Sequence, residues 1–224
     1  VTDMSYAFNH TAKAYASIDG SQNLTSFNEN IAGWDTGNVT NMTLTFKGTS
    51  FNQDISSWNV SKVINTYGMF WGSNFNQNIG DWNVHNVTTL SHTFTFSDFD
   101  QDISLWNVSK VNDMQSMFRC PFNQNIALWN VSEVKSMKEM FFRNSDNSTD
   151  NLFDHDISSW NVSKVKNMYR MFRQSVFNQN IGSWNVNEVT DMGEMFYSNY
   201  EFNQDLRHFT WDMSNVSIDA SMFY

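Results

Sequence analysis

The sequence is poor in residues that cross-link a chain or carry it through a membrane. Its 224 residues include a single cysteine, Cys120, and a single proline. One cysteine excludes an internal disulfide framework, so we expect stacked apolar layers to stabilise the fold. No apolar run approaches the roughly 18 residues that a membrane helix needs, so we expect no membrane insertion by this segment.

Positive charge is also scarce. The chain has 13 lysines and arginines against 23 aspartates and glutamates, which gives a net charge of -10. The resulting negative field disfavours phosphate backbones and anionic lipids, so we do not expect nucleic acid as a partner. Aromatic residues make up 16% of the chain, which supplies enough large side chains to form a core.

Common catalytic signatures are missing as well. The sequence contains no H-E-x-x-H, C-x-x-C, G-x-S-x-G or G-x-x-x-x-G-K-[ST] motif. The histidines are scattered over different repeats, and His155 replaces the glutamine usual at its position, so we interpret it as a surface substitution rather than a metal ligand. We predict a protein that is not an enzyme, with no catalytic residues and no cofactor.

A repeat of about 24 residues dominates what is present. Its signature is F-[ND]-x-[ND]-[IL]-x-x-W, and the steps between its phenylalanines, from Phe27 to Phe202, are 24, 24, 24, 23, 31, 24 and 25. A near-constant step with one long outlier predicts a stack of coils with one inserted loop. We expect the repeat's tryptophans to form a ladder with their rings inside: Trp34, Trp58, Trp82, Trp106, Trp129, Trp160, Trp184 and Trp211.

A second signature, W-[ND]-V-[ST]-x-V-x-x-M-x-x-M-F, completes each repeat. Alternation in W-x-V predicts a short strand, and the three-residue steps from valine through methionine predict a tight helical arc. The expected fold is an α/β repeat solenoid of about eight coils with a short-stranded parallel sheet. We expect one domain, residues 1–224, which opens in mid-repeat because Val1–Phe8 matches Val189–Phe196, with insertions near 9–26 and 143–152.

Two asparagine-or-aspartate columns follow the phenylalanine. The first predicts side chains that bond turn backbone groups and the next coil. The second alternates strictly between asparagine and aspartate, which would keep like charges about 10 Å apart. A row of calcium ions is the alternative, and its candidate ligands are Asp54, Asp102, Asp156 and Asp205.

Eleven N-x-[ST] sequons predict N-glycans in a eukaryotic secretory pathway. The candidates are Asn147, Asn9, Asn23, Asn59, Asn107, Asn130 and Asn161. Asn147 lies in the polar insertion and is the first choice. The alternative is that N-V-S belongs to the repeat and creates sequons without glycosylation.

The string F-N-Q-D-I-S-S-W-N-V-S-K-V at Phe51–Val63, together with V-K-N-M-Y-R-M-F at Val165–Phe172, resembles the BspA-like leucine-rich-repeat surface proteins. The same repeat occurs in mycoplasma surface lipoproteins as a domain of unknown function. The resemblance covers essentially the whole chain. It implies a right-handed, leucine-rich-repeat-like solenoid, an extracellular or cell-surface location, and a role in adhesion or surface assembly.

We therefore expect a structural or adhesion module at the cell surface. Its partners would be a protein, a glycan or further copies of itself, because weak contacts repeated along a rod add up. A carbohydrate-binding module is the alternative, and it requires the tryptophan column or Trp71 to face solvent. A cation-binding surface array is a further alternative.

Overall fold

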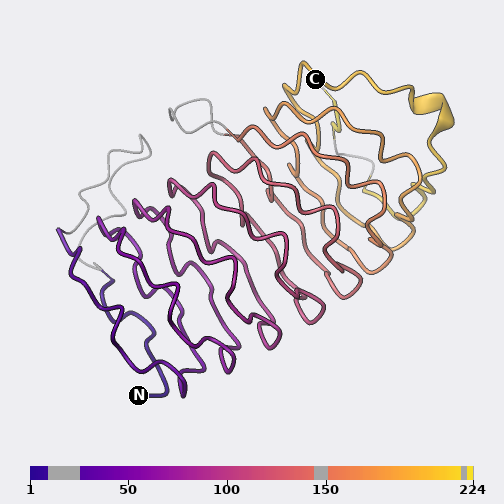
Figure 1. Cartoon of the computed structure of the whole chain (residues 1–224). Helices are drawn as coiled ribbons and strands as arrows, with labels where there is room; N and C mark the ends of the chain where they lie inside the picture. The colour runs from indigo at the N-terminus through magenta and orange to yellow at the C-terminus, as the bar shows by residue number, and fades with distance from the viewer. Residues whose placement is uncertain (10–25, 144–150, 218–220, 224) are drawn as a thin grey trace.

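The chain winds into a row of coils that lie side by side in sequence order (Figure 1). The computed structural model describes residues 1–9, 26–143, 151–217 and 221–223. Parallel bridges join equivalent residues of successive coils in one line, for example Asn41 to Asn65 and Asn65 to Thr89. The 24-residue period of the sequence is therefore the length of one coil. The core of both expected insertions, residues 10–25 and 144–150, lies outside the described ranges.

Regular secondary structure is almost absent from the described residues. The one element there is a 3-10 helix, η1 (Leu206–His208). The predicted strand at W-x-V and the predicted helical arc are both wrong: the bridges are isolated and fall two residues after the second valine of the repeat. Within the same ranges, no helix is long and apolar enough to span a bilayer.

Tandem turns replace the expected helical arc. In one coil the amide of Thr45 donates to the carbonyl of Met42, and the turn's third residue, Leu44, has a φ of 53°. His92, Glu139 and other non-glycine residues at this position of the repeat have the same left-handed φ. A positive φ at the third residue is what a type II turn requires, and it cannot continue a right-handed helix.

Two phenylalanine columns form the centre of the stack. Within a coil the ring after the methionines stacks on the ring that opens the next copy, as in Phe94 and Phe99, whose centroids are 3.9 Å apart. Between coils the spacing is larger, for instance 5.8 Å from Phe70 to Phe94. These rings are fully buried. Each coil thus supplies a ring pair that its neighbours cover on both sides.

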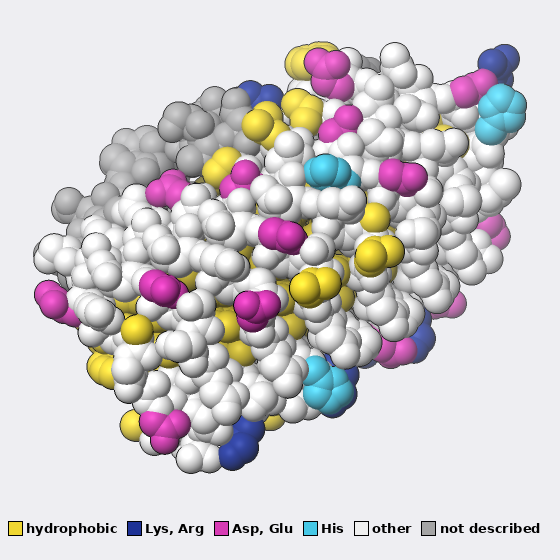
Figure 2. Space-filling view, in the orientation of Figure 1, with side chains coloured by type: hydrophobic (Ala, Val, Ile, Leu, Met, Phe, Trp, Pro, Cys, Tyr) yellow, Lys and Arg dark blue, Asp and Glu magenta, His cyan; other side chains and the backbone are white. Residues whose placement is uncertain are grey.

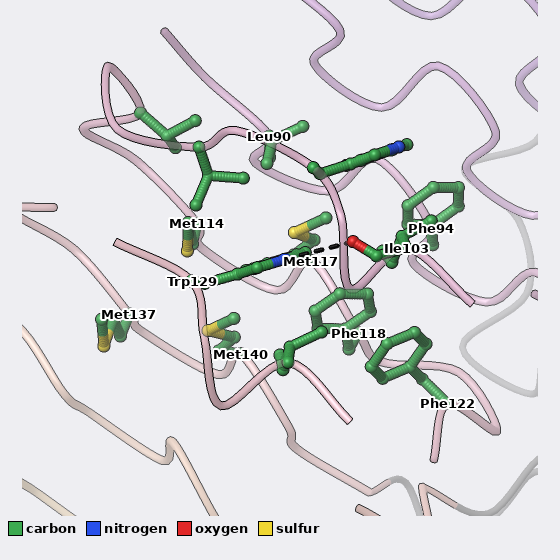
Figure 3. Packing of buried hydrophobic residues seen from close by; sticks show 14 of the residues in the cluster. Leu90, Phe94, Ile103, Met114, Met117, Phe118, Phe122, Trp129, Met137 and Met140 are labelled. Atoms are coloured by element: carbon green, nitrogen blue, oxygen red, sulfur yellow. Dashed lines mark hydrogen bonds between the residues drawn. The ribbon is translucent and has the colours of Figure 1, made fainter. Parts of the chain in front are cut away.

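The tryptophans tie each coil to the one before it. Trp129 is buried, and its indole N–H donates to the carbonyl oxygen of Ile103 at 3.1 Å (Figure 3). The same bond recurs from Trp58 to Trp211, always to the isoleucine of the preceding coil. Trp34 differs, because 48% of its surface is exposed. In Figure 3 the methionines lie beside Trp129, where flexible thioethers fill the space around the ring.

A polar ladder runs outside the aromatic columns. The side-chain Oδ1 of Asn76 accepts the backbone N–H of Asp100, one coil later, at 3.0 Å. It also accepts the amide of Gln101 at 2.9 Å. His155 occupies the glutamine position in its own coil, and its Nε2 lies 2.9 Å from the carbonyl oxygen of Asn123. This histidine therefore contacts a backbone carbonyl of the preceding coil, as the glutamine at this position does in the next coil.

Candidate functional site

The side chains over the tandem turns form a half-exposed surface that we call the cation–aromatic row. It crosses the stack from Lys47 to Tyr197, because most residues that follow the phenylalanine after the methionines are half-exposed; the exceptions, Thr95 and Phe142, are buried. Its members are Lys47, Trp71, His92, Phe96, Arg119, Phe142, Arg173 and Tyr197.

Arginines and rings alternate along the second half of the row. The guanidinium of Arg119 lies 4.8 Å from the ring centroid of Phe96 and 4.5 Å from that of Phe142. Arg173 lies between Phe142, at 5.7 Å, and Tyr197, at 4.5 Å. Such contacts hold a planar cation against apolar surface while part of it stays accessible.

Two glutamates balance these arginines. Glu139 accepts a hydrogen bond from Arg119 at 2.9 Å, and Glu194 pairs with both Arg170 and Arg173. Burial lowers the pKa of Arg119, while Glu139 opposes that shift. The row is therefore a fixed, mutually supported layer of side chains.

The first half of the row is built around Trp71. The ring of Trp71 stacks on the ring of His92, with their centroids 4.8 Å apart. The Lys47 ammonium lies 4.4 Å from the centroid of the Trp71 ring. Burial, reinforced by Arg119 and nearby lysines, lowers the pKa of His92 from 6.5 to about 4. His92 is thus neutral at pH 7, which lets it stack on Trp71 without adding a buried charge.

The alternating second column forms turns. Oδ1 of Asp54 accepts the backbone N–H of Ser56, Asp102 accepts from Ser104, and Asp156 accepts from Ser158. These bonds lower the pKa values of the three carboxyls; that of Asp205 is lowered first by its side-chain bond to Arg207. Asparagines of the column accept the same bond; for example, Oδ1 of Asn78 accepts the backbone N–H of Gly80. Across the described residues, no three acidic, histidine or cysteine side chains gather in a way that could hold a metal.

The seven candidate glycosylation asparagines fall into three groups. Asn59, Asn107, Asn130 and Asn161 are exposed at equivalent positions, and each Oδ1 accepts the N–H of the serine two residues on. Asn9 is half-buried, and its Oδ1 lies buried without a hydrogen-bond partner among the described residues. Asn23 and Asn147 lie outside the described residues.

Cys120 is fully buried, and burial raises its pKa far above the usual range. Its Sγ lies 3.6 Å from the carbonyl oxygen of Phe99, where other coils have a serine or threonine hydroxyl, as at Ser97. A thiol held protonated in this way is a poor nucleophile. Cys120 instead packs inside the coil between Phe99 and Phe122, which is one residue shorter than the usual 24.

Sequence reasoning did not find the cation–aromatic row. Its members occupy variable positions of the repeat, so no signature marks them. A signal does exist: the residues directly after the buried phenylalanines read Lys47, Trp71, Thr95, Arg119, Phe142, Arg173 and Tyr197. Apart from Thr95, that column consists of cations and rings.

Two exposed leucines were missed as well. Leu105 and Leu128 lie on successive coils and are 83% and 91% exposed. Equivalent positions elsewhere hold Ser57, Asp81 and Ser159, so the fold does not require leucine there.

The comparisons with known proteins identify one family. The model described as "Mycoplasma protein of unknown function, DUF285" matches residues 1–97, 71–152 and 122–224, so it occurs three times and spans the chain. Neither the curated proteins nor the solved structures gave a match.

Proposed function

Because the chain belongs to the DUF285 family of mycoplasma proteins of unknown function, we propose that it is a non-enzymatic adhesion or structural module of the cell surface. Its stacked coils would share the right-handed winding of the BspA-like leucine-rich-repeat surface proteins. The observation that carries the proposal is the cation–aromatic row, which presents arginine, tyrosine and tryptophan side chains across successive coils. These residue types dominate protein-binding hot spots.

The geometry of the row suits contact with another protein. Its rings and guanidinium groups are already fixed by one another, so binding would cost little side-chain entropy. Contacts at successive coils would add through effective concentration, which favours an extended partner or a surface carrying many copies of one. Further copies of this chain meet the same requirement.

The alternative based on exposed tryptophans loses most of its basis. Trp58, Trp82, Trp106, Trp129, Trp160 and Trp184 are buried, and their indole N–H groups bond inside the stack. Trp71 is half-buried and contacts His92 and Lys47. Six of the eight repeat tryptophans therefore offer no sugar-stacking platform, whereas Trp34, 48% exposed, and the half-buried Trp211 lie at the two ends of the stack.

The test is the adhesion of protein-coated beads to cultured animal epithelial cells. The double variant Trp71→Ser/Tyr197→Ser removes two rings of the row, and we expect bead adhesion to fall at least tenfold because repeated weak contacts are lost together. A matched control, Trp34→Ser/Tyr200→Ser, removes the same side chains from exposed positions outside the row. Circular dichroism verifies that both variants keep the fold. Equal adhesion by the two double variants would contradict the role of the row.

A further inference from the structure

The last copy of the repeat carries an irregularity that shapes the surface. Trp211 follows Phe202 by nine residues, whereas the other tryptophans follow their phenylalanine by seven. The coil returns to register nevertheless: Trp211 donates to Ile181, and the amide of Thr210 donates to Gly182 at 3.1 Å. The extra residues are taken up by η1, which projects from the edge of the stack near the C-terminus (Figure 1).

A groove of about 540 Å³ lies between this projection and the two preceding coils. That volume falls in the usual range for small-ligand sites. Phe209 anchors the projection against Gly182, where a Cβ atom would come within 2.6 Å of the phenylalanine ring. The groove is lined by Asp156, Ser158, Gln179, Asn180, Gly182, Ser183, His208 and Thr210.

Three groove side chains have hydrogen-bonding capacity left over. Asn180 uses Oδ1 to accept from Gly182, which leaves its NH₂ group as a donor. Gln179 uses Nε2 to donate to Asp154, which leaves Oε1 as an acceptor. Asp156 accepts from Ser158 through Oδ1, and a carboxylate has further lone pairs for ligand donors.

The lining narrows the chemistry of the ligand. Its polar character disfavours an apolar molecule, and the Asp156 carboxylate disfavours an anion. The chain as a whole is also negative, with a net charge of -10, and the face in Figure 2 carries scattered carboxylates, with lysine and arginine near its margins. A metal is not favoured, because the described residues hold no suitable group of three ligands. Hydroxyl groups, which both donate and accept, match a carboxylate beside two amides.

We propose that this groove binds a neutral sugar unit of a glycan. The groove lies apart from the cation–aromatic row, so it adds a second kind of contact to the surface role proposed above. Asp156 and Gln179 accept from sugar hydroxyls, and the Asn180 amide donates to one. The inference rests on the proposed surface function only in its choice of a glycan as the biological source of the sugar.

The repeat itself supplies matched variants for the test. Asp156→Asn and Asn180→Asp each keep the turn-forming Oδ1, because both residue types occur at this position of the repeat. Asp102→Asn and Asn125→Asp make the same exchanges in coils outside the groove. Binding is measured by isothermal titration and saturation-transfer NMR with glucose, galactose, mannose, fucose, N-acetylglucosamine, N-acetylgalactosamine and their disaccharides.

We expect at least one neutral sugar to bind, with the Kd raised tenfold or more by Asp156→Asn and by Asn180→Asp. The two control exchanges should change the Kd less than twofold. No binding by any sugar of the panel, or equal losses in groove and control variants, overturns the proposal. So does a preference for sialylated or sulfated sugars. If the sugar titrations overturn the groove proposal, bead adhesion that survives Asp156→Asn would still leave the proposed function of the row standing.

Discussion

The coils between Phe51 and Phe196 and the last copy of the repeat share one set of hydrogen bonds but bury their side chains differently. Trp106 and Ile103 are buried, whereas Trp211 is half-buried and Leu206, at the isoleucine position, is 45% exposed. The indole–carbonyl bond is present in both regions. Polar ladders therefore set the register of a coil, and they tolerate two extra residues. Apolar burial is what an end of the stack lacks, since Trp34, at the other end, has the regular seven-residue spacing and is also 48% exposed.

Removal of a repeat tryptophan should give the largest difference in stability between the central coils and the last copy. We expect Trp106→Ala to lower the free energy of unfolding by about 3 to 5 kcal/mol, because it opens a cavity in coils that depend on each other. Trp211→Ala should cost clearly less, since its ring is half-buried. Urea titration followed by circular dichroism measures both. Equal losses would mean that burial does not distinguish these regions.

Acid should weaken the central coils through His92. Its pKa is lowered to about 4 in the folded state and is 6.5 when unfolded, so the unfolded chain binds more protons between these values. The stabilisation is present above pH 6.5 and is lost as the pH falls towards 4. The loss amounts to about 3 kcal/mol.

The measurement is urea titration at pH 7 and at pH 4. Between pH 7 and pH 4 we expect the free energy of unfolding of the wild type to fall by about 3 kcal/mol more than that of His92→Gln, because glutamine does not titrate. Identical pH dependence in the two proteins would refute the assignment of the acid effect to His92.

The polar ladder gives a smaller effect. Asn76→Ala leaves the amides of Asp100 and Gln101 without their acceptor and should cost about 1 to 2 kcal/mol. Asn203, in the last copy, donates its own N–H to Asn178 but accepts no bond through its side chain from the described residues. Asn203→Ala should therefore change stability by less than about 0.5 kcal/mol. Thermal melting of both variants provides the comparison.

A local backbone effect should be alike in two successive coils near the C-terminal end of the stack. Gln174 and Ser198 have φ values of 56° and 54° at equivalent positions. Glycine adopts the left-handed conformation without the steric strain of a Cβ atom. Replacing either residue by glycine should therefore stabilise the protein by about 0.5 to 1 kcal/mol after the entropy cost of glycine is subtracted. Chemical denaturation is sensitive enough to detect this. A gain at only one of the two sites would show that surroundings, rather than backbone conformation, decide the effect.

The sequence predicted those features that depend on spacing. The period of the tryptophans gives the length of a coil, and asparagine beside phenylalanine gives the ladder that Asn76 represents. Local conformation was harder to predict. W-x-V alternates as a strand does, yet the amide of Val63 bonds the carbonyl of Val60 within a turn. A sequence pattern reports which side chains are buried, and a tight turn can bury alternate residues as well as a strand can.

The surface sites could be predicted least. Arg119 and Phe142 come together only because coils stack, and they occupy positions that the repeat leaves free. The groove beside Asp156 depends on the fold of two extra residues in another copy. The slipped tryptophan signalled an irregularity, but its shape follows from the contact of Phe209 with Gly182, which no period encodes.

The direction of the indole bonds bears on how the protein is made. Every repeat tryptophan from Trp58 to Trp211, which excludes Trp71, donates its indole N–H to a carbonyl that the ribosome has already synthesised. A newly emerged coil can thus dock on a finished template, and the structure can grow from its N-terminal side as translation proceeds. We expect ribosome-stalled chains to gain protease resistance in increments of one coil. A single late step would mean instead that the stack condenses only after release.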